Sequence, residues 1–154
     1  MPQLVKGGKY VFGWSAVSAE GCIVIPPEAF DEYRFASHDR AIAFSGSRTS
    51  GGFALVLPHN LQASPLSAML ERCPELAEYR IPEGQTVYCG AKTCCWVALH
   101  DASFRMPEQT LQHYGVTPGS CLLVVRGSGI GPTFIVRGRI VEEARQHPEI
   151  DVFS

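Results

Sequence analysis

Apolar residues occur along this chain in short runs separated mostly by glycine, proline or serine. Runs of this length, bounded by turn residues, are typical of β-strands. They predict strands at 10–17, 22–25, 40–46, 52–57, 94–99, 103–106, 121–127 and 133–138. No run approaches the roughly 18 apolar residues that a membrane-spanning helix requires, so we expect no membrane association.

Short helices are predicted between these strands. "PPEAFDEY" (26–33) and "PEQTLQHY" (107–114) begin with proline, which the first helical turn tolerates because its N–H has no partner there. Both carry glutamate near the start, where the helix dipole favours negative charge. Two further helices, at 66–73 and 140–147, each end at a following proline. The order strand, strand, short helix, strand, loop, strand, helix therefore occurs twice.

The two occurrences align at a constant spacing. Tyr33 and Tyr114 lie 81 positions apart. The same spacing matches Pro26 with Pro107, Phe30 with Leu111, Gly46 with Gly127, Ser47 with Ser128 and Phe53 with Phe134. Further on, "ERCPEL" (71–76) matches "RQHPEI" (145–150) at a spacing of 74. Turn-rich segments can look alike by composition alone, but a single spacing that joins such different residue types favours an internal duplication.

The duplication predicts three segments. Residues 1–73 form a first repeat with an N-terminal arm and a trailing helix, 74–93 form a connector with a turn at "IPEGQ", and 94–154 form a second repeat with a C-terminal helix. A unit of about 45 residues with four short strands buries too little apolar surface to be stable alone. We therefore expect one body in which the repeats share a core.

The composition places the chain among globular proteins, because 45% of its 154 residues are hydrophobic and 18% are charged. The N-terminus lacks the apolar segment and cleavage site of a signal peptide, so we expect a cytoplasmic protein. In that compartment the six cysteines are expected to be reduced thiols, mostly packed as small apolar side chains. The formal net charge of -2 provides no global attraction to nucleic acid.

The stretch "VSAEGCIVIPPEAFDEYRF" (17–35), followed by "HDRAIAFSG" (38–46), resembles the AbrB/SpoVT/MazE-like swapped-hairpin family. In the second repeat, "FRMPEQTLQHYGVTPGSCLLVV" (104–125) matches the family's short helix, the Y-G-V that ends it and the P-G-x turn that follows. The resemblance covers about residues 10–56 and 94–137. It implies a mainly β fold with short helices (α+β), in which two repeats in one chain form a pseudo-twofold, barrel-like body. In the family the two units usually come from a homodimer.

The resemblance also implies a DNA-binding transcription regulator. Family members contact DNA through arginines around the first hairpin, whereas this chain has Gly21 and Cys22 at the usual glycine-arginine position. Only Arg105 falls in the corresponding hairpin of the second repeat. A DNA surface would have to be assembled from Lys6, Lys9, Arg48, Arg126, Arg137 and Arg139, and the first candidates among these are Lys6, Lys9, Arg137 and Arg139.

The two glycine-serine loops, "SGSRTSGGF" (45–53) and "RGSGIGPTF" (126–134), support a different function. Glycines allow backbone N–H groups to approach a ligand, and consecutive N–H groups can bind an anion. The arginine of each loop would pair with a carboxylate or phosphate. The candidate residues for a small anionic ligand are Ser45, Gly46, Ser47, Arg48, Thr49, Ser50, Gly51, Gly52, Arg126, Gly127, Ser128 and Gly129. Ordinary hairpin loops have the same composition, so this alternative remains open beside DNA binding.

Catalysis and metal binding have little support in the sequence. "CGAKTCC" (89–95) lacks the paired spacing of a zinc site, and "HDAS" (100–103) aligns with a hairpin turn of the first repeat. No nucleophile and base can be paired, so we expect neither an enzyme nor a cofactor. Trp14 and Trp96 occupy corresponding strand positions and are expected to anchor the core. A monomer with a pseudo-dimeric core and a homo-oligomer both remain open.

Overall fold

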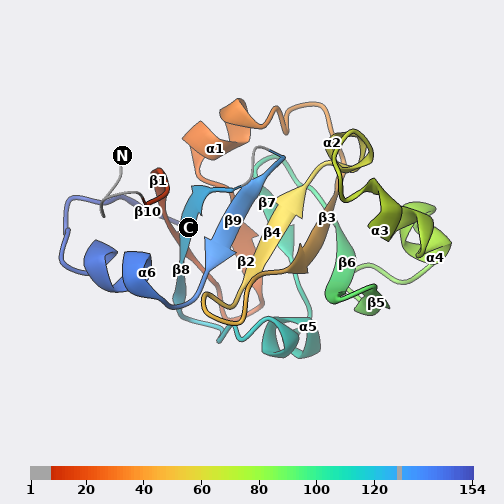
Figure 1. The fold of residues 1–154 in the computed structure, drawn as a ribbon. Helices are drawn as coiled ribbons and strands as arrows, with labels where there is room; N and C mark the ends of the chain where they lie inside the picture. The colour runs from red at the N-terminus through yellow and green to blue at the C-terminus, as the bar shows by residue number, and fades with distance from the viewer. Residues whose placement is uncertain (1–7, 128–129) are drawn as a thin grey trace.

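The structure is a computed structural model that describes residues 8–127 and 130–154 (Figure 1). It is an α+β fold made mostly of strands. The strands are β1 (Val11–Ala16), β2 (Cys22–Val24), β3 (Arg40–Ser45), β4 (Phe53–Val56), β5 (Val87–Cys89), β6 (Lys92–Ala98), β7 (Ser103–Arg105), β8 (Cys121–Arg126), β9 (Pro132–Ile135) and β10 (Val152–Phe153). The helices are α1 (Pro27–Glu32), α2 (Pro58–Gln62), α3 (Ser67–Glu71), α4 (Pro74–Ala77), α5 (Glu108–His113) and α6 (Arg139–Ala144).

Eight strands form one large sheet in the order β10-β1-β8-β9-β4-β3-β6-β5. All neighbours are antiparallel except β1 and β10. Strands from the two halves of the chain interleave, because β1 pairs with β8 and β6 pairs with β3. At the centre β4 pairs with β9, and Phe53 lies opposite Phe134.

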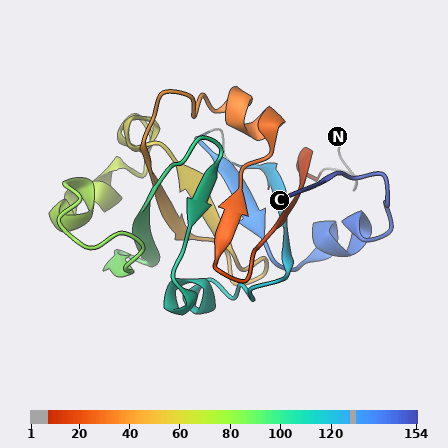
Figure 2. The ribbon, with the colours of Figure 1, turned by 180° about the vertical axis from the view of Figure 1, so that it is seen from behind.

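The remaining strands, β2 and β7, form a two-stranded antiparallel ribbon in which Ile23 lies opposite Phe104. Seen from behind, the ribbon lies in front of the sheet, with α1 and α5 at opposite ends (Figure 2). The largest core fills the space between these layers, and Phe53 and Phe134 stack there with their ring centres 4.9 Å apart. The buried Ser15 ties β1 to β2, because its hydroxyl donates to the carbonyl of Val24 and accepts from the N–H of Val24.

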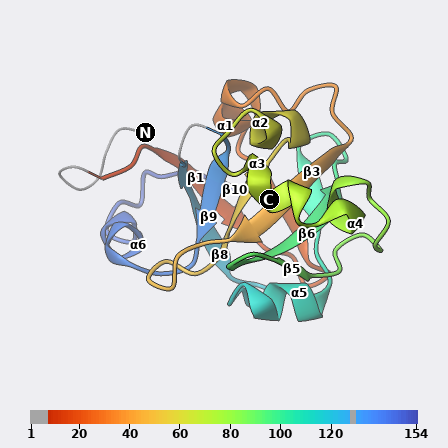
Figure 3. The ribbon, with the colours of Figure 1, turned by 45° about the vertical axis from the view of Figure 1, so that its right-hand side comes forward.

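The opposite face of the sheet, called the outer face below, is covered by helices at its two sides. One side, over β3 and β6, is packed by α2, α3 and α4, and the other, over β1 and β8, by α6 (Figures 1 and 3). These two side cores are separate from the large core. Between them β4 and β9 have no described helix above them (Figure 1).

The sheet is open, whereas the sequence led us to expect a barrel-like body. Its edges are β10 and β5, which do not pair with each other. Both edge strands lie outside the predicted repeat pattern: β5 comes from the connector and β10 from the last residues of the chain. They extend the sheet outward rather than closing it.

All eight predicted strands and four predicted helices are present, as β1–β4, β6–β9, α1, α3, α5 and α6. The turn predicted at "IPEGQ" is also present, at Glu83 and Gly84. The sequence missed α2, α4, β5 and β10, each of five residues or fewer. Elements this short depend on tertiary contacts, so local periodicity carries no signal for them. No described helix is long and apolar enough to cross a bilayer.

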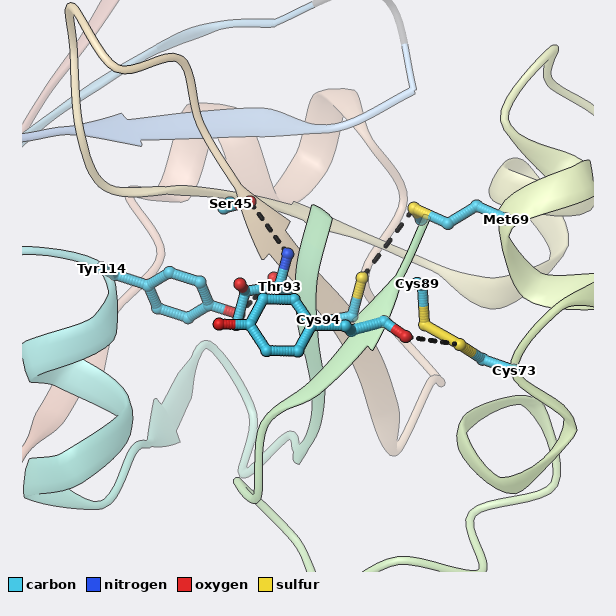
Figure 4. The surroundings of a disulfide bond; sticks show 8 residues. Ser45, Met69, Cys73, Cys89, Thr93, Cys94 and Tyr114 are labelled. Atoms are coloured by element: carbon cyan, nitrogen blue, oxygen red, sulfur yellow. Dashed lines mark hydrogen bonds between the residues drawn. A yellow bond between two sulfur atoms is a disulfide. The ribbon is translucent and has the colours of Figure 1, made fainter. Parts of the chain in front are cut away.

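The expectation that all six cysteines are reduced thiols is wrong for two of them, because Cys73 and Cys89 form a disulfide (Figure 4). Cys73 precedes α4 and Cys89 ends β5, and packing of α4 against the sheet brings the two together. Cys94 and Cys95 are buried thiols, as expected, whereas Cys22 and Cys121 are exposed.

Candidate functional site

A groove of about 350 Å³ runs over the middle of the outer face, and we call it the central groove. Both glycine-serine loops contribute to it, although they lie at opposite ends of the β4–β9 pair (Figure 1). Its lining consists of apolar side chains from the sheet and from α6, residues of the two loops, and two lysines: Phe44, Ala54, Val125, Thr133, Ile135, Ile140, Ser45, Gly46, Ser47, Ser50, Ile130, Gly131, Lys9 and Lys92.

Lys92 and Lys9 are the charged residues of the central groove, and no Asp or Glu of the described chain lines it. Lys92 lies at the start of β6, where its Nζ donates to the carbonyl of Ser45 at 3.3 Å. The same Nζ lies 5.8 Å from the ring centre of Phe44. An apolar floor with two cations and no carboxylate favours an amphipathic anion over a cation.

The first loop, 45–52, owes its shape to its glycines. Gly52 has a φ of 71°, and a Cβ added there would lie 1.9 Å from the carbonyl oxygen of Phe134. The N–H of Gly52 donates to the backbone carbonyl of Tyr114. The N–H of Gly51 donates to the carbonyl of Ser47, and the N–H of Gly46 donates to the carbonyl of Gly52. These amides are therefore used within the protein. The serines and lysines of the groove, rather than a nest of free N–H groups, remain for a ligand.

Arg48 lies outside the groove, beside Arg137. One guanidinium N–H of Arg137 donates to the carbonyl of Arg48 at 2.8 Å, and Arg139 follows at the first position of α6. We call Arg48, Arg137 and Arg139 the arginine patch. All three are exposed, and within the described chain none has a carboxylate oxygen within 4.0 Å. The patch therefore keeps its charge available to an anionic partner.

Arg126 faces away from the central groove. Its guanidinium forms two hydrogen bonds with the carboxylate of Glu32 in α1, at 2.6 and 2.8 Å. It also lies over the ring of Tyr10, 4.5 Å from its centre. The hydrogen bonds that Arg126 donates to the Glu32 carboxylate raise the pKa of Arg126 above its usual value. This arginine joins β8 to α1 and is occupied by a protein partner.

The remaining candidate residues are dispersed. Thr49, Gly51, Gly52 and Gly127 do not line the central groove. Lys6, Ser128 and Gly129 lie outside the described residues. The structure thus brings together the serines of the first loop with Lys9, and it places Arg48 beside Arg137, both of which the sequence offered for a DNA surface.

The cysteine-rich segment holds no metal cluster. Within the described ranges no three His, Cys, Asp or Glu residues could hold an ion together. Burial raises the pKa of Cys94 to about 12 and that of Cys95 to about 11, so both thiols are protonated at neutral pH. His100 and Ser103 close a hairpin turn, as expected, since the His100 N–H donates to the Ser103 carbonyl.

Lys92 is the site residue that sequence reasoning missed. It stands inside "CGAKTCC", a segment that drew attention only for its cysteines. Its role depends on the pairing of β6 with β3, which places residues 92 and 45 side by side although 47 positions separate them. No local pattern carries that information.

Comparison of the chain with models of known protein families finds no match, and comparison with curated proteins finds none either.

Proposed function

We propose that this chain is an AbrB-like regulatory protein that binds DNA, built from two swapped-hairpin repeats related by a pseudo-twofold axis. The single observation that carries the proposal is the pairing of positions 81 residues apart. Phe53 lies opposite Phe134 at the centre of the sheet, and Ile23 lies opposite Phe104 in the ribbon. A pseudo-twofold axis between the two repeats would bring equivalent residues opposite each other in this way, and the pairing therefore supports the proposal.

The interleaving of strands supports the same proposal. In a swapped-hairpin arrangement, the first strand of each unit pairs with the other unit. Here β1 pairs with β8 and β6 with β3. The register agrees to within one residue: Trp14 is opposite Leu123 as Trp96 is opposite Ile42, where Leu123 and Ile42 lie 81 positions apart and the tryptophans 82, and β1 carries a register shift between Val11 and Gly13.

The arginine patch is the surface through which we expect DNA to bind. Neutralisation of phosphates by Lys and Arg supplies most of the sequence-independent affinity for DNA, and guanidinium groups bind phosphate in a bidentate way. Arg48, Arg137 and Arg139 are exposed and have no carboxylate partner in the described chain. They compensate for the missing hairpin arginines from a different part of the fold.

Fluorescence anisotropy with a labelled mixed-sequence duplex at low salt tests this proposal. We expect binding that weakens with salt, and the double variant R48A/R137A should lower the slope of log K against log salt by about 2. The matched control is R80A, because Arg80 is exposed but pairs with Glu78 at 2.8 Å. A folded protein without binding, or equal slopes for both variants, would contradict the proposal.

A second candidate function, binding of a small anionic ligand, is favoured by the central groove. The groove combines an apolar floor with Lys9 and Lys92, and residues of both glycine-serine loops line it. Octanoate is a suitable probe because it joins an apolar chain to one carboxylate. We expect it to raise the melting temperature of the wild type and of R80Q, and to do so less for K92Q. An equal rise in all three proteins would remove Lys92 from the site.

A further inference from the structure

The two tryptophans of the outer face occupy matching strand positions but have different surroundings. Trp96 in β6 is covered by the chain itself. Its indole N–H donates to the carbonyl of Ile81 at 2.8 Å, and the ring of Tyr79 meets it edge-on with centres 5.4 Å apart. The guanidinium carbon of Arg40 lies 5.3 Å from its ring centre. These contacts hold the partly buried ring of Trp96 in place.

Trp14 in β1 is also partly buried, against the side core under α6, but no hydrogen bond, ring contact or cation from the described residues engages its indole. Arg40 lies opposite Ala98 in the sheet, and the residue in the corresponding place, opposite Ala16, is Cys121. At this place β8 carries the thiol of Cys121, whereas β3 carries the guanidinium of Arg40. Beside Trp14 there is a pocket of about 440 Å³, which we call the Trp14 pocket.

The lining of the Trp14 pocket defines the chemistry of its ligand. Trp14, Val136 and Val152 supply apolar surface, and Val152 is 58% exposed, which is rare for a large apolar residue of this protein. Thr117 and Ser120 add hydroxyl groups. The pocket volume lies within the range of small-molecule sites, and an indole favours a flat partner that can stack on it.

Arg145 of the α6 C-terminus is the charged residue in this lining, and no Asp or Glu of the described chain lines the pocket. One of its N–H groups donates to Glu142 at 2.9 Å, in a pair whose side chains are 59% and 66% exposed. The other donors of the guanidinium have no partner among the described residues, and a guanidinium binds a carboxylate by two parallel hydrogen bonds. A cationic ligand would meet this charge unfavourably.

We propose that the Trp14 pocket binds a planar aromatic carboxylate, with its ring against Trp14 and its carboxylate at Arg145. The proposal is independent of DNA binding and of the central groove. It assigns a use to the asymmetry between the two sides of the outer face: the side covered by the shorter segment, 138–154, leaves space beside Trp14, and the ligand fills that space.

Protection of Cys121 from alkylation tests the proposal. Cys121 lines the pocket, whereas Cys22 is an exposed thiol elsewhere that serves as an internal control. The full-length protein is treated with iodoacetamide, with and without 2-naphthoate, and both sites are followed by peptide mass spectrometry. We expect 2-naphthoate to slow alkylation of Cys121 at least threefold and to leave Cys22 unchanged. Equal rates at Cys121 with and without millimolar 2-naphthoate, or equal slowing at both cysteines, would overturn the proposal.

Two surface variants and an uncharged probe test the role of Arg145. R145Q should require about tenfold more 2-naphthoate for half-maximal protection, because a charge-assisted hydrogen bond is lost. E142Q frees the guanidinium from its pair and should bind 2-naphthoate at least as well as the wild type. 2-Naphthalenemethanol should protect the wild type and R145Q equally. If R145Q and wild type respond alike to 2-naphthoate, the assignment of the carboxylate to Arg145 is wrong.

Discussion

The two sides of the outer face differ although their strands match. Over β3 and β6, three helices and the Cys73–Cys89 disulfide enclose a side core that includes Leu61, Leu70 and Leu76. Over β1 and β8, α6 alone covers a smaller side core, with β10 beside it. Residues 57–93 provide the elements that cover the first side, and residues 138–154 provide those that cover the second.

This difference teaches that the length of the covering segment, rather than the strand sequence, decides how each side is filled. The longer segment brings Tyr79 and Ile81 onto Trp96, whereas the shorter one ends as an edge strand and leaves Trp14 beside a pocket. A closed side contributes stability, and an open side contributes space for a ligand. The following predictions test that contrast, from the largest expected effect to the smallest.

Truncation of a core residue should cost more on the closed side. Leu76 in α4 is fully buried, whereas Ile140 in α6 is only partly buried. We expect Leu76→Ala to lower the free energy of unfolding by about 3 to 4 kcal/mol, since it leaves a cavity, and Ile140→Ala to lower it by about 1 to 2 kcal/mol. Urea unfolding at equilibrium measures both, and equal costs would contradict the contrast.

The disulfide should stabilise the closed side. Its cysteines are 16 positions apart, and closing a loop of that size stabilises a fold by about 3 kcal/mol. We expect the double variant C73A/C89A to lose about 2 to 3 kcal/mol and to become insensitive to reductant. Hydrogen exchange should speed up in α4 and β5 while α6 keeps its protection. Faster exchange in α6 by the same factor would show that the two sides unfold together.

The two tryptophans should respond differently to the same substitution. Trp96→Phe removes the hydrogen bond to Ile81 and weakens the contact with Arg40. We expect a loss of about 1 to 2 kcal/mol in unfolding free energy. Trp14→Phe removes no hydrogen bond described for that ring and should cost less than about 1 kcal/mol. Thermal unfolding of both variants measures the difference, and a larger loss for Trp14→Phe would reverse the comparison.

The open side should carry a small pH dependence through His147, which follows α6. Hydrogen bonds with Glu149 and Glu143 raise the pKa of His147 above its usual value. A raised folded-state pKa stabilises the fold fully below the unfolded pKa of about 6.5, and this stability is lost as pH rises through the folded value. His147→Gln should therefore reduce stability slightly near pH 6 and not at pH 9. Because the group is exposed, the effect is the smallest of the four, and a loss at pH 9 equal to that near pH 6 would exclude this linkage.

The eight strands and four of the helices could be predicted from the sequence, because they depend on local signals. Prolines at 27, 74 and 148 mark helix boundaries, and alternating runs between glycines define the strands. The candidate site was predicted only in part. The serines of the first loop, predicted for a ligand site, line the central groove, and Lys9, predicted only for a DNA surface, lines it too. Lys92 was not, because it reaches Ser45 only through the pairing of distant strands.

The disulfide and the fate of the arginines also depended on tertiary structure. Cys73 and Cys89 carry no local pairing signal and meet because α4 packs against the sheet. Arg48 and Arg126 belong to similar loops. Arg126 forms an ion pair with Glu32, whereas Arg48 stays exposed beside Arg137. Charge partners of this kind are set by the spatial arrangement of elements.

The sequence by itself determined the α+β class and the eight predicted strands, because each strand follows from a pattern within a few residues. Only the tertiary structure decided that the sheet is open, that one tryptophan is covered and the other faces a pocket, and that two lysines share a groove. The physical reason is that each of these features depends on contacts between segments far apart in the sequence. Whether a segment covers a tryptophan, closes the sheet or brings two lysines together is decided by the path of the whole chain, not by any local stretch.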